Sequence, residues 1–282
     1  MSIKIVSDST CDLSPELIKR YNISILPLHI LLGEEEYNDG VNITPEAIYS
    51  WSDANKTTPR TSAPSIEEAI NLFRELTADG SEVISFSISQ SMSASNNVMR
   101  LAAEELELED KIHVVDSANL STGIGLTVIE AAVMASNGMS SSEILSELGK
   151  LIPRVRASFV VDTLTYLHRG GRCSGLAALA GGALKLHPRI DVKDGKMGAS
   201  KKYRGKMNHV IITYVKELTE ELINAKSDRV FITHSGCDAQ LVDSVREYLE
   251  SLHRFDEILE TRAGGVVSSH CGPGTLGVLY IK

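Results

Sequence analysis

The chain has 282 residues, of which 43% are hydrophobic and 23% charged, so it is long enough to bury a substantial core and is not disordered as a whole. Its formal net charge of −9 argues against nucleic-acid binding and leaves room for at most transient contact with an anionic membrane. Four cysteines without a CxxC pair indicate neither a disulfide framework nor a zinc site.

Short apolar runs alternate with helical patterns in the first half of the chain, as in βα units on a mostly parallel sheet. Strands are expected at 3–6, 23–32 with a break at Pro27, 83–89 and 112–115. Capping patterns predict helices after Ser14, after Thr44, and from Ser65 to about Thr77. A later helix should turn Val98, Leu101 and Ala102 inward, and the apolar stretch 120–136 predicts a buried helix.

A second unit is expected to begin near Arg154. Strands are predicted at 159–161, 230–233, 257–261 and 276–281, and helices near 208–224 and 238–252. The turn residues 193–196 between two strand-like runs predict a hairpin, and therefore a mixed sheet. The fold class is thus α/β in two domains: 1–153 with a mostly parallel sheet and flanking helices, and 154–282 with a mixed sheet.

Four segments are rich in Ser, Thr and Gly, namely 60–65, 87–96, 164–172 and 264–275. The first two precede predicted helices, where hydroxyls and free backbone N–H groups favour an anion, although N-caps and turns use the same residues. The third should be a short helix that ends at Gly170-Gly171. The fourth is interpreted as a glycine loop in which His270 could donate a hydrogen bond to an anion.

Several other chemistries lack their motifs. No phosphate-binding GxxxxGK[ST] loop and no GxSxG elbow occur, and Val128 replaces the third glycine of a dinucleotide fingerprint. His234 and Asp238 are four positions apart without a third ligand, so no metal site and no cofactor are expected. The N-terminal residues show no signal-peptide pattern and no apolar run could span a bilayer, so we expect a cytoplasmic protein.

Motifs along nearly the whole chain resemble those of the DegV family of bacterial lipid-binding proteins. The segments that carry the resemblance are Val6-Ser7-Asp8-Ser9-Thr10-Cys11-Asp12-Leu13, Leu26-Pro27-Leu28-His29-Ile30, Tyr37-Asn38-Asp39-Gly40, 61–65, Val115-Asp116-Ser117 with Ser121-Thr122-Gly123-Ile124-Gly125, Asp162-Thr163-Leu164 with Tyr166-Leu167 and Gly170-Gly171-Arg172, and His270-Cys271-Gly272-Pro273-Gly274.

The resemblance implies a fold of two α/β domains with one long-chain fatty acid buried between them. It further implies a protein that is not itself an enzyme, but the substrate-carrying subunit of a fatty acid kinase, whose separate catalytic subunit phosphorylates the bound carboxylate. By the same resemblance, Thr61, Ser62, Ser93 and His270 would hold the carboxylate. Arg204 and Arg172 would contact the head group or the partner.

This sequence departs from the family pattern at three places: Ala94-Ser95-Asn96 stand where Gly-Thr-Tyr is usual, and Cys173 and Cys271 replace an apolar residue and a Thr.

Other functions remain open. A Ser/His acyl-ester hydrolase would use Ser93 and His270 and turn over a chromogenic ester. A binder of another small anionic metabolite would have a polar, water-filled cleft. A purely structural or regulatory protein would bind no small ligand.

Overall fold

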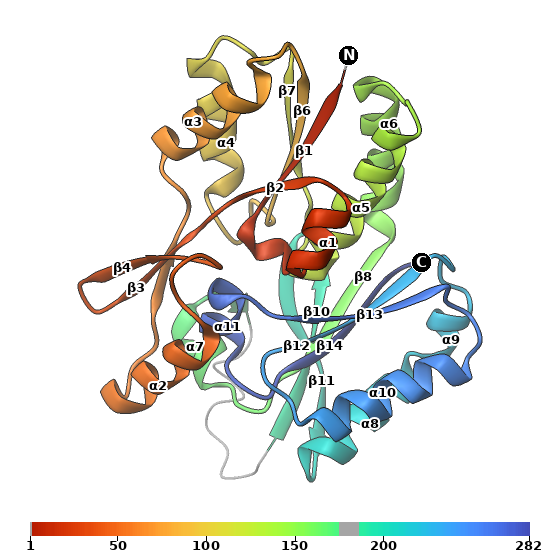
Figure 1. Ribbon diagram of the computed structural model, residues 1–282. Helices are drawn as coiled ribbons and strands as arrows, with labels where there is room; N and C mark the ends of the chain where they lie inside the picture. Colours follow the sequence, from red (N-terminus) through yellow and green to blue (C-terminus); the bar gives the residue numbers. More distant parts are fainter. Residues whose placement is uncertain (1, 175–185) are drawn as a thin grey trace.

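The structure, a computed structural model, describes residues 2–174 and 186–282. In the first half of the chain, a four-stranded sheet has the order β2-β1-β6-β7, and all neighbouring strands are parallel (Figure 1). Its strands are β1 (Ile3–Asp8), β2 (Ile23–Leu26), β6 (Glu82–Ser87) and β7 (Ile112–Asp116).

Helices cover both faces of this sheet because successive side chains of each strand point to opposite sides. Val6 and Val83 pack against the helices α3 (Ile66–Thr77) and α4 (Ser95–Glu105). Ile5 and Ile84 face the other way, towards α1 (Pro15–Arg20) and α5 (Thr122–Ser136), with α6 (Ser141–Leu151) behind α5. The short helices η1 (Ser9–Cys11) and η2 (Ile152–Arg154) follow β1 and α6, respectively.

The second half of the chain forms a seven-stranded mixed sheet in the order β13-β12-β14-β8-β10-β11-β9. Its strands are β8 (Val155–Val160), β9 (Cys173–Ser174), β10 (Leu186–Lys193), β11 (Lys196–Arg204), β12 (Arg229–His234), β13 (Glu257–Arg262) and β14 (Leu276–Ile281). One face is covered by α8 (Met207–Glu217), α9 (Thr219–Ile223) and α10 (Ala239–Ser251). The other face shares a core with α5 and the first sheet. The predicted α/β fold class, with a parallel and then a mixed sheet, is confirmed.

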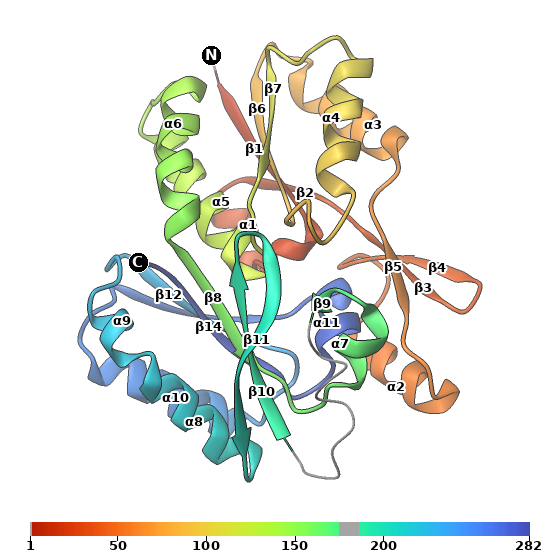
Figure 2. The same ribbon diagram turned by 180° about the vertical axis from the view of Figure 1, so that it is seen from behind.

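A third, smaller sheet has the order β4-β3-β5 and consists of β3 (His29–Leu32), β4 (Glu35–Asn38) and β5 (Arg60–Ser62). Together with α2 (Pro45–Asn55) it packs on α11 (Gly265–Cys271), which lies beside α7 (Thr165–Gly170) (Figure 2). Segments from the two ends of the chain therefore lie side by side. The division into domains 1–153 and 154–282 stays a prediction, since this small sheet belongs to the first range and packs on the second.

Local signals predicted most elements correctly. Ser65 and Glu68 form the predicted capping box of α3, and the hairpin between β10 and β11 turns at Asp194 and Gly195, both with positive φ. One inner-face prediction was wrong: Leu101 is 39% exposed. The buried stripe of α4 lies one position away, at Met99, Ala102 and Ala103.

Candidate functional site

A cavity of about 290 Å³ lies where the two larger sheets and α11 meet. Its wall is mainly apolar and includes Leu28, Ile88, Leu120, Phe159, Met197 and Leu279. These side chains come from both halves of the chain, so the cavity forms only when the halves are docked. An apolar wall suits an alkyl chain, because each methylene group transferred from water gains about 0.8 kcal/mol.

Polar side chains from three separate segments line the same cavity. Thr61 and Ser62 lie on β5, Ser93 precedes α4, and His270 lies near the end of α11. Thr61 Oγ1 is 2.8 Å from His270 Nε2, in a hydrogen bond between residues 209 positions apart. The structure thus brings the four predicted carboxylate-binding residues to one cavity. Their role in binding stays a prediction.

The His270 side chain is half-buried, and the loss of hydration around its ring, together with the nearby Arg172 guanidinium, lowers its pKa from 6.5 to about 4. The ring is therefore neutral near pH 7 and carries one N–H. Its Nδ1 atom is buried and has no hydrogen-bond partner among the described residues. A Cβ atom on Gly170 of α7 would overlap Nδ1, so the missing side chain at that position makes room for the ring.

The Ser93 hydroxyl lies 2.9 Å from that of Ser95 and accepts a hydrogen bond from the Ser95 N–H at 3.2 Å. Asn96 donates to the Ser87 hydroxyl at 3.0 Å and is also buried. Of the three residues that depart from the family pattern here, only Ala94 lines the cavity. Two of the three changes are therefore accommodated by hydrogen bonds outside the cavity wall. Cys271 is buried and lines the cavity, whereas the side chain of Cys173 lies outside the described residues.

The prediction that His270 lies in a glycine loop was wrong, because 265–271 form the helix α11. Arg172 lines the cavity, but Arg204 does not. Arg204 is exposed at the end of β11, opposite Leu186 of β10, and remains a predicted partner contact.

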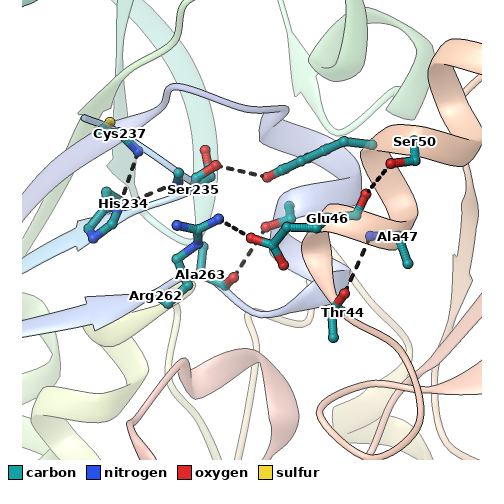
Figure 3. A network of polar contacts seen from close by, with 12 residues as sticks. Thr44, Glu46, Ala47, Ser50, His234, Ser235, Cys237, Arg262 and Ala263 are labelled. Carbon is teal, nitrogen blue, oxygen red and sulfur yellow. Dashed lines mark hydrogen bonds and ion pairs between the residues drawn. The ribbon is translucent and has the colours of Figure 1, made fainter. Parts of the chain in front are cut away.

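The nucleophile–base pair of a Ser/His hydrolase is not assembled. The hydroxyl partner of His270 is Thr61, and that of Ser93 is Ser95. His234, considered above as a metal ligand, accepts hydrogen bonds from the backbone N–H groups of Gly236 and Cys237 at its Nδ1 atom (Figure 3). Among the described residues, no three His, Cys, Asp or Glu side chains are grouped so as to hold a metal ion.

Sequence reasoning missed the contacts that attach α2 to the cavity wall. Tyr49 donates a hydrogen bond to the carbonyl oxygen of Ser235 at 3.1 Å, and Ser235 lines the cavity. Glu46 and Arg262 form an ion pair at 2.5 Å, which Figure 3 shows between α2 and the end of β13. Glu46 and Tyr49 lie two and five residues after the N-cap Thr44 on one helix, and this spacing gives no signal of distant partners.

The comparisons with known proteins agree over the full length of the chain. The family model described as "Uncharacterised protein, DegV family" matches residues 2–282. A DegV domain-containing protein of Deinococcus radiodurans is 32% identical over 280 residues, covering 99% of this chain and 98% of the relative.

Two solved structures are similar in sequence and in fold. A DegV family protein of Thermus thermophilus, described with fatty acid binding, has a TM-score of 0.91 and 31% identity, with 100% of each chain covered. A stearic acid-binding protein of Eubacterium ventriosum has a TM-score of 0.86 and 32% identity, covering 100% of this chain and 98% of its own. In the part of this chain that the structure describes, no helix is both long and apolar enough to cross a membrane.

Proposed function

Since this chain belongs to the DegV family, we propose that it binds one long-chain fatty acid in the cavity between its two larger sheets. One observation carries the proposal: the wall of an apolar cavity includes Thr61 and His270, which are hydrogen-bonded to each other. Burying about 14 methylene groups contributes roughly 11 kcal/mol before ordering costs, which is enough for tight binding. The similar proteins described as binding fatty acids support the same ligand class.

The carboxylate of the ligand lies against Thr61, Ser62, Ser93 and His270 in this proposal. A buried carboxylate without hydrogen bonds would cost several kcal/mol, so its binding site needs donors. Hydroxyl groups and a neutral imidazole donate without forming a strong ion pair, and Arg172 adds a positive charge at the exposed side. The carboxylate thereby keeps one oxygen available for reaction.

The proposed role is that of a cytoplasmic substrate carrier for a separate kinase subunit. One carboxylate oxygen attacks the terminal phosphorus of a nucleoside triphosphate held by that subunit. A new P–O bond forms, the bond to the nucleoside diphosphate breaks, and an acyl phosphate results. No catalytic residue is required of this chain, and Arg204 is a candidate contact to the kinase subunit.

The first test is to extract the purified protein with organic solvent and to identify released molecules by mass spectrometry. Near-stoichiometric long-chain fatty acid is expected, and its identity would supply the chain length. A clean extract, from protein that also fails to bind added palmitic acid, would overturn the proposal and favour a polar anion instead.

Replacing Ser93 by Ala tests the head-group assignment. Loss of one hydrogen bond to a charged group should weaken palmitate binding by about tenfold or more. Ser136→Ala is the matched control, because that exposed hydroxyl donates only to the carbonyl oxygen of Val133 at the end of α5. Equal affinities of wild type and Ser93→Ala, measured by calorimetry, would remove Ser93 from the site.

A further inference from the structure

The helix that carries His270 has no capping side chain of its own. Gly264 is the N-cap of α11 and supplies only backbone. Instead, two carboxylates from the N-terminal half accept the first backbone N–H groups: Asp12 Oδ1 from Gly264 at 2.8 Å, and Asp39 Oδ1 from Gly265 at 2.7 Å. Carboxylates at a helix N-terminus are favoured by its free N–H groups and its dipole.

Both glycines allow this close approach. A Cβ atom on Gly264 would lie 3.0 Å from Asp12 Oδ1, and one on Gly265 would lie 2.9 Å from Asp39 Oδ1. The same added atom on Gly265 would also lie 2.6 Å from Ile30 Cδ1. The start of α11 is thus fitted to the two acids, with no space for a side chain between them.

The second oxygen of each carboxylate is hydrogen-bonded to the cavity wall, directly for Asp12 and through Ser9 for Asp39. Ser121 lines the cavity and donates to Asp12 Oδ2 at 2.5 Å. Ser9 donates to Asp39 Oδ2 at 2.8 Å and accepts from the N–H of Leu28, another lining residue, at 3.1 Å. Each acid therefore connects α11 to a lining residue from the first half of the chain.

Both acids are almost fully buried, with 5% exposure for Asp12 and 2% for Asp39. Burial raises the pKa of both carboxyl groups, and the hydrogen bonds from α11 oppose that rise. In either protonation state an oxygen remains to accept from the helix N–H. The hydrogen bonds from the α11 N–H groups can therefore form whether each carboxyl group is protonated or ionised.

We propose that Asp12 and Asp39 are positioning residues, which hold α11 so that His270 stays within hydrogen-bond distance of Thr61 at the head-group end of the cavity. The inference rests on the proposed function, because the head group is the fatty acid carboxylate. Neither acid lines the cavity. They act through the helix, and the whole effect of their removal on binding should pass through His270.

The test compares full-length variants for binding of [1-¹³C]palmitic acid after removal of endogenous lipid. Asp39→Ala removes the acceptor, whereas Asp39→Asn retains an oxygen for the Gly265 N–H. We expect Asp39→Ala to weaken binding by about tenfold or more and Asp39→Asn to restore most of the affinity. Glu130→Gln is the matched control: Glu130 is a buried carboxylate whose hydrogen bonds go to Arg229 and Lys226 of the second half and not to the N-terminus of α11.

A double-mutant cycle separates positioning from a general structural role. In the background His270→Ala, Asp39→Ala should cause little further loss of affinity, because the residue through which it acts is already absent. The histidine ring resonances of His270, assigned by their absence in His270→Ala, should shift in Asp39→Ala and not in Glu130→Gln. If Asp39→Ala does not fold, Asp12→Ala and Asp12→Asn test the other contact in the same way.

The possible results point in different directions. Wild-type protein that binds no palmitate would refute the proposed function itself. Wild-type binding that falls in His270→Ala but not in Asp39→Ala or Asp12→Ala would overturn only the positioning role. Additive losses in the double mutant, with unshifted His270 resonances, would likewise overturn it, since they would show an effect independent of the imidazole.

Discussion

At the scale of single residues, the central feature is a half-buried imidazole that is neutral at physiological pH. Most histidines titrate near pH 6.5, whereas burial and Arg172 lower the pKa of His270 to about 4. With the ligand proposed above, a protonated ring would form a strong ion pair with the carboxylate and so reduce its reactivity. A neutral ring forms no ion pair and is hydrogen-bonded to the Thr61 hydroxyl beside it.

The depressed pKa of His270 makes stability depend on pH. Between pH 6.5 and 4 the unfolded chain binds a proton at this residue that the folded protein does not, so stability falls as the pH falls through this range. A shift of this size corresponds to about 3 kcal/mol. Urea unfolding of His270→Gln should therefore show a smaller loss between pH 6.5 and 4 than the wild type.

The comparison with His270→Gln is needed because Asp8 titrates in the opposite sense. Burial raises the pKa of Asp8 to about 6, so its contribution is present below pH 3.8 and is lost as the pH rises through 6. This contribution is common to both proteins and cancels in their difference. Identical pH profiles of wild type and His270→Gln would show that His270 titrates normally.

At the scale of elements, α7 and α11 define the position of the His270 ring. Gly170 ends α7 directly against the Nδ1 atom of His270. Two short helices from distant parts of the chain thus share one contact in which a glycine is required. Packing of this kind has no tolerance for an added methyl group, since neither helix can move away without breaking other contacts.

Gly170→Ala should displace the His270 ring and weaken palmitate binding by about tenfold, a loss of about 1.4 kcal/mol. The control is Gly149→Ala in α6, where an added Cβ atom meets nothing within 4 Å. That exposed helical position should gain roughly 0.5–1 kcal/mol in the free energy of unfolding, with unchanged binding. Calorimetric titration and urea unfolding measure both quantities, and normal affinity in Gly170→Ala would contradict the packing argument.

At the scale of the whole molecule, ion pairs join the two halves of the chain at two places. At the first, Glu130 of α5 bonds Arg229 and Lys226, and both Glu130 and Arg229 are buried. At the second, Glu46 and Arg262 form a pair whose side chains are 66% and 41% exposed. The two contacts link the same halves, but solvent screens only the second.

Breaking these contacts should have very different costs. Glu130→Ala removes the close partner of the buried Arg229 guanidinium, leaves it only the Glu257 carboxylate at 4.0 Å, and should lower the free energy of unfolding by about 3–5 kcal/mol. Glu46→Ala removes an exposed pair and should cost at most about 1 kcal/mol. Urea unfolding at two salt concentrations distinguishes them, because only the exposed pair should weaken with salt. Equal costs would mean that Glu130 is not desolvated as the structure indicates.

Whether a feature of the fold could be predicted from the sequence depends on how far apart in the chain the interacting residues are. The capping box at Ser65, the hairpin at Asp194 and the end of α7 at Gly171 each depend on neighbours within a few positions, and all three were predicted. The alternation of strands and helices likewise determined the α/β class. The resemblance to a family then named the candidate residues of the site.

Only the tertiary structure decided how those residues meet. In the structure, His270 is hydrogen-bonded to Thr61 and not to Ser93, and Arg204 does not line the cavity. The glycine-rich stretch around His270 forms the helix α11. The caps of α11 come from residues 252 and 226 positions away, so no local pattern signals that helix. Local propensity acts over a single turn, whereas the cavity exists only where distant segments pack against one another.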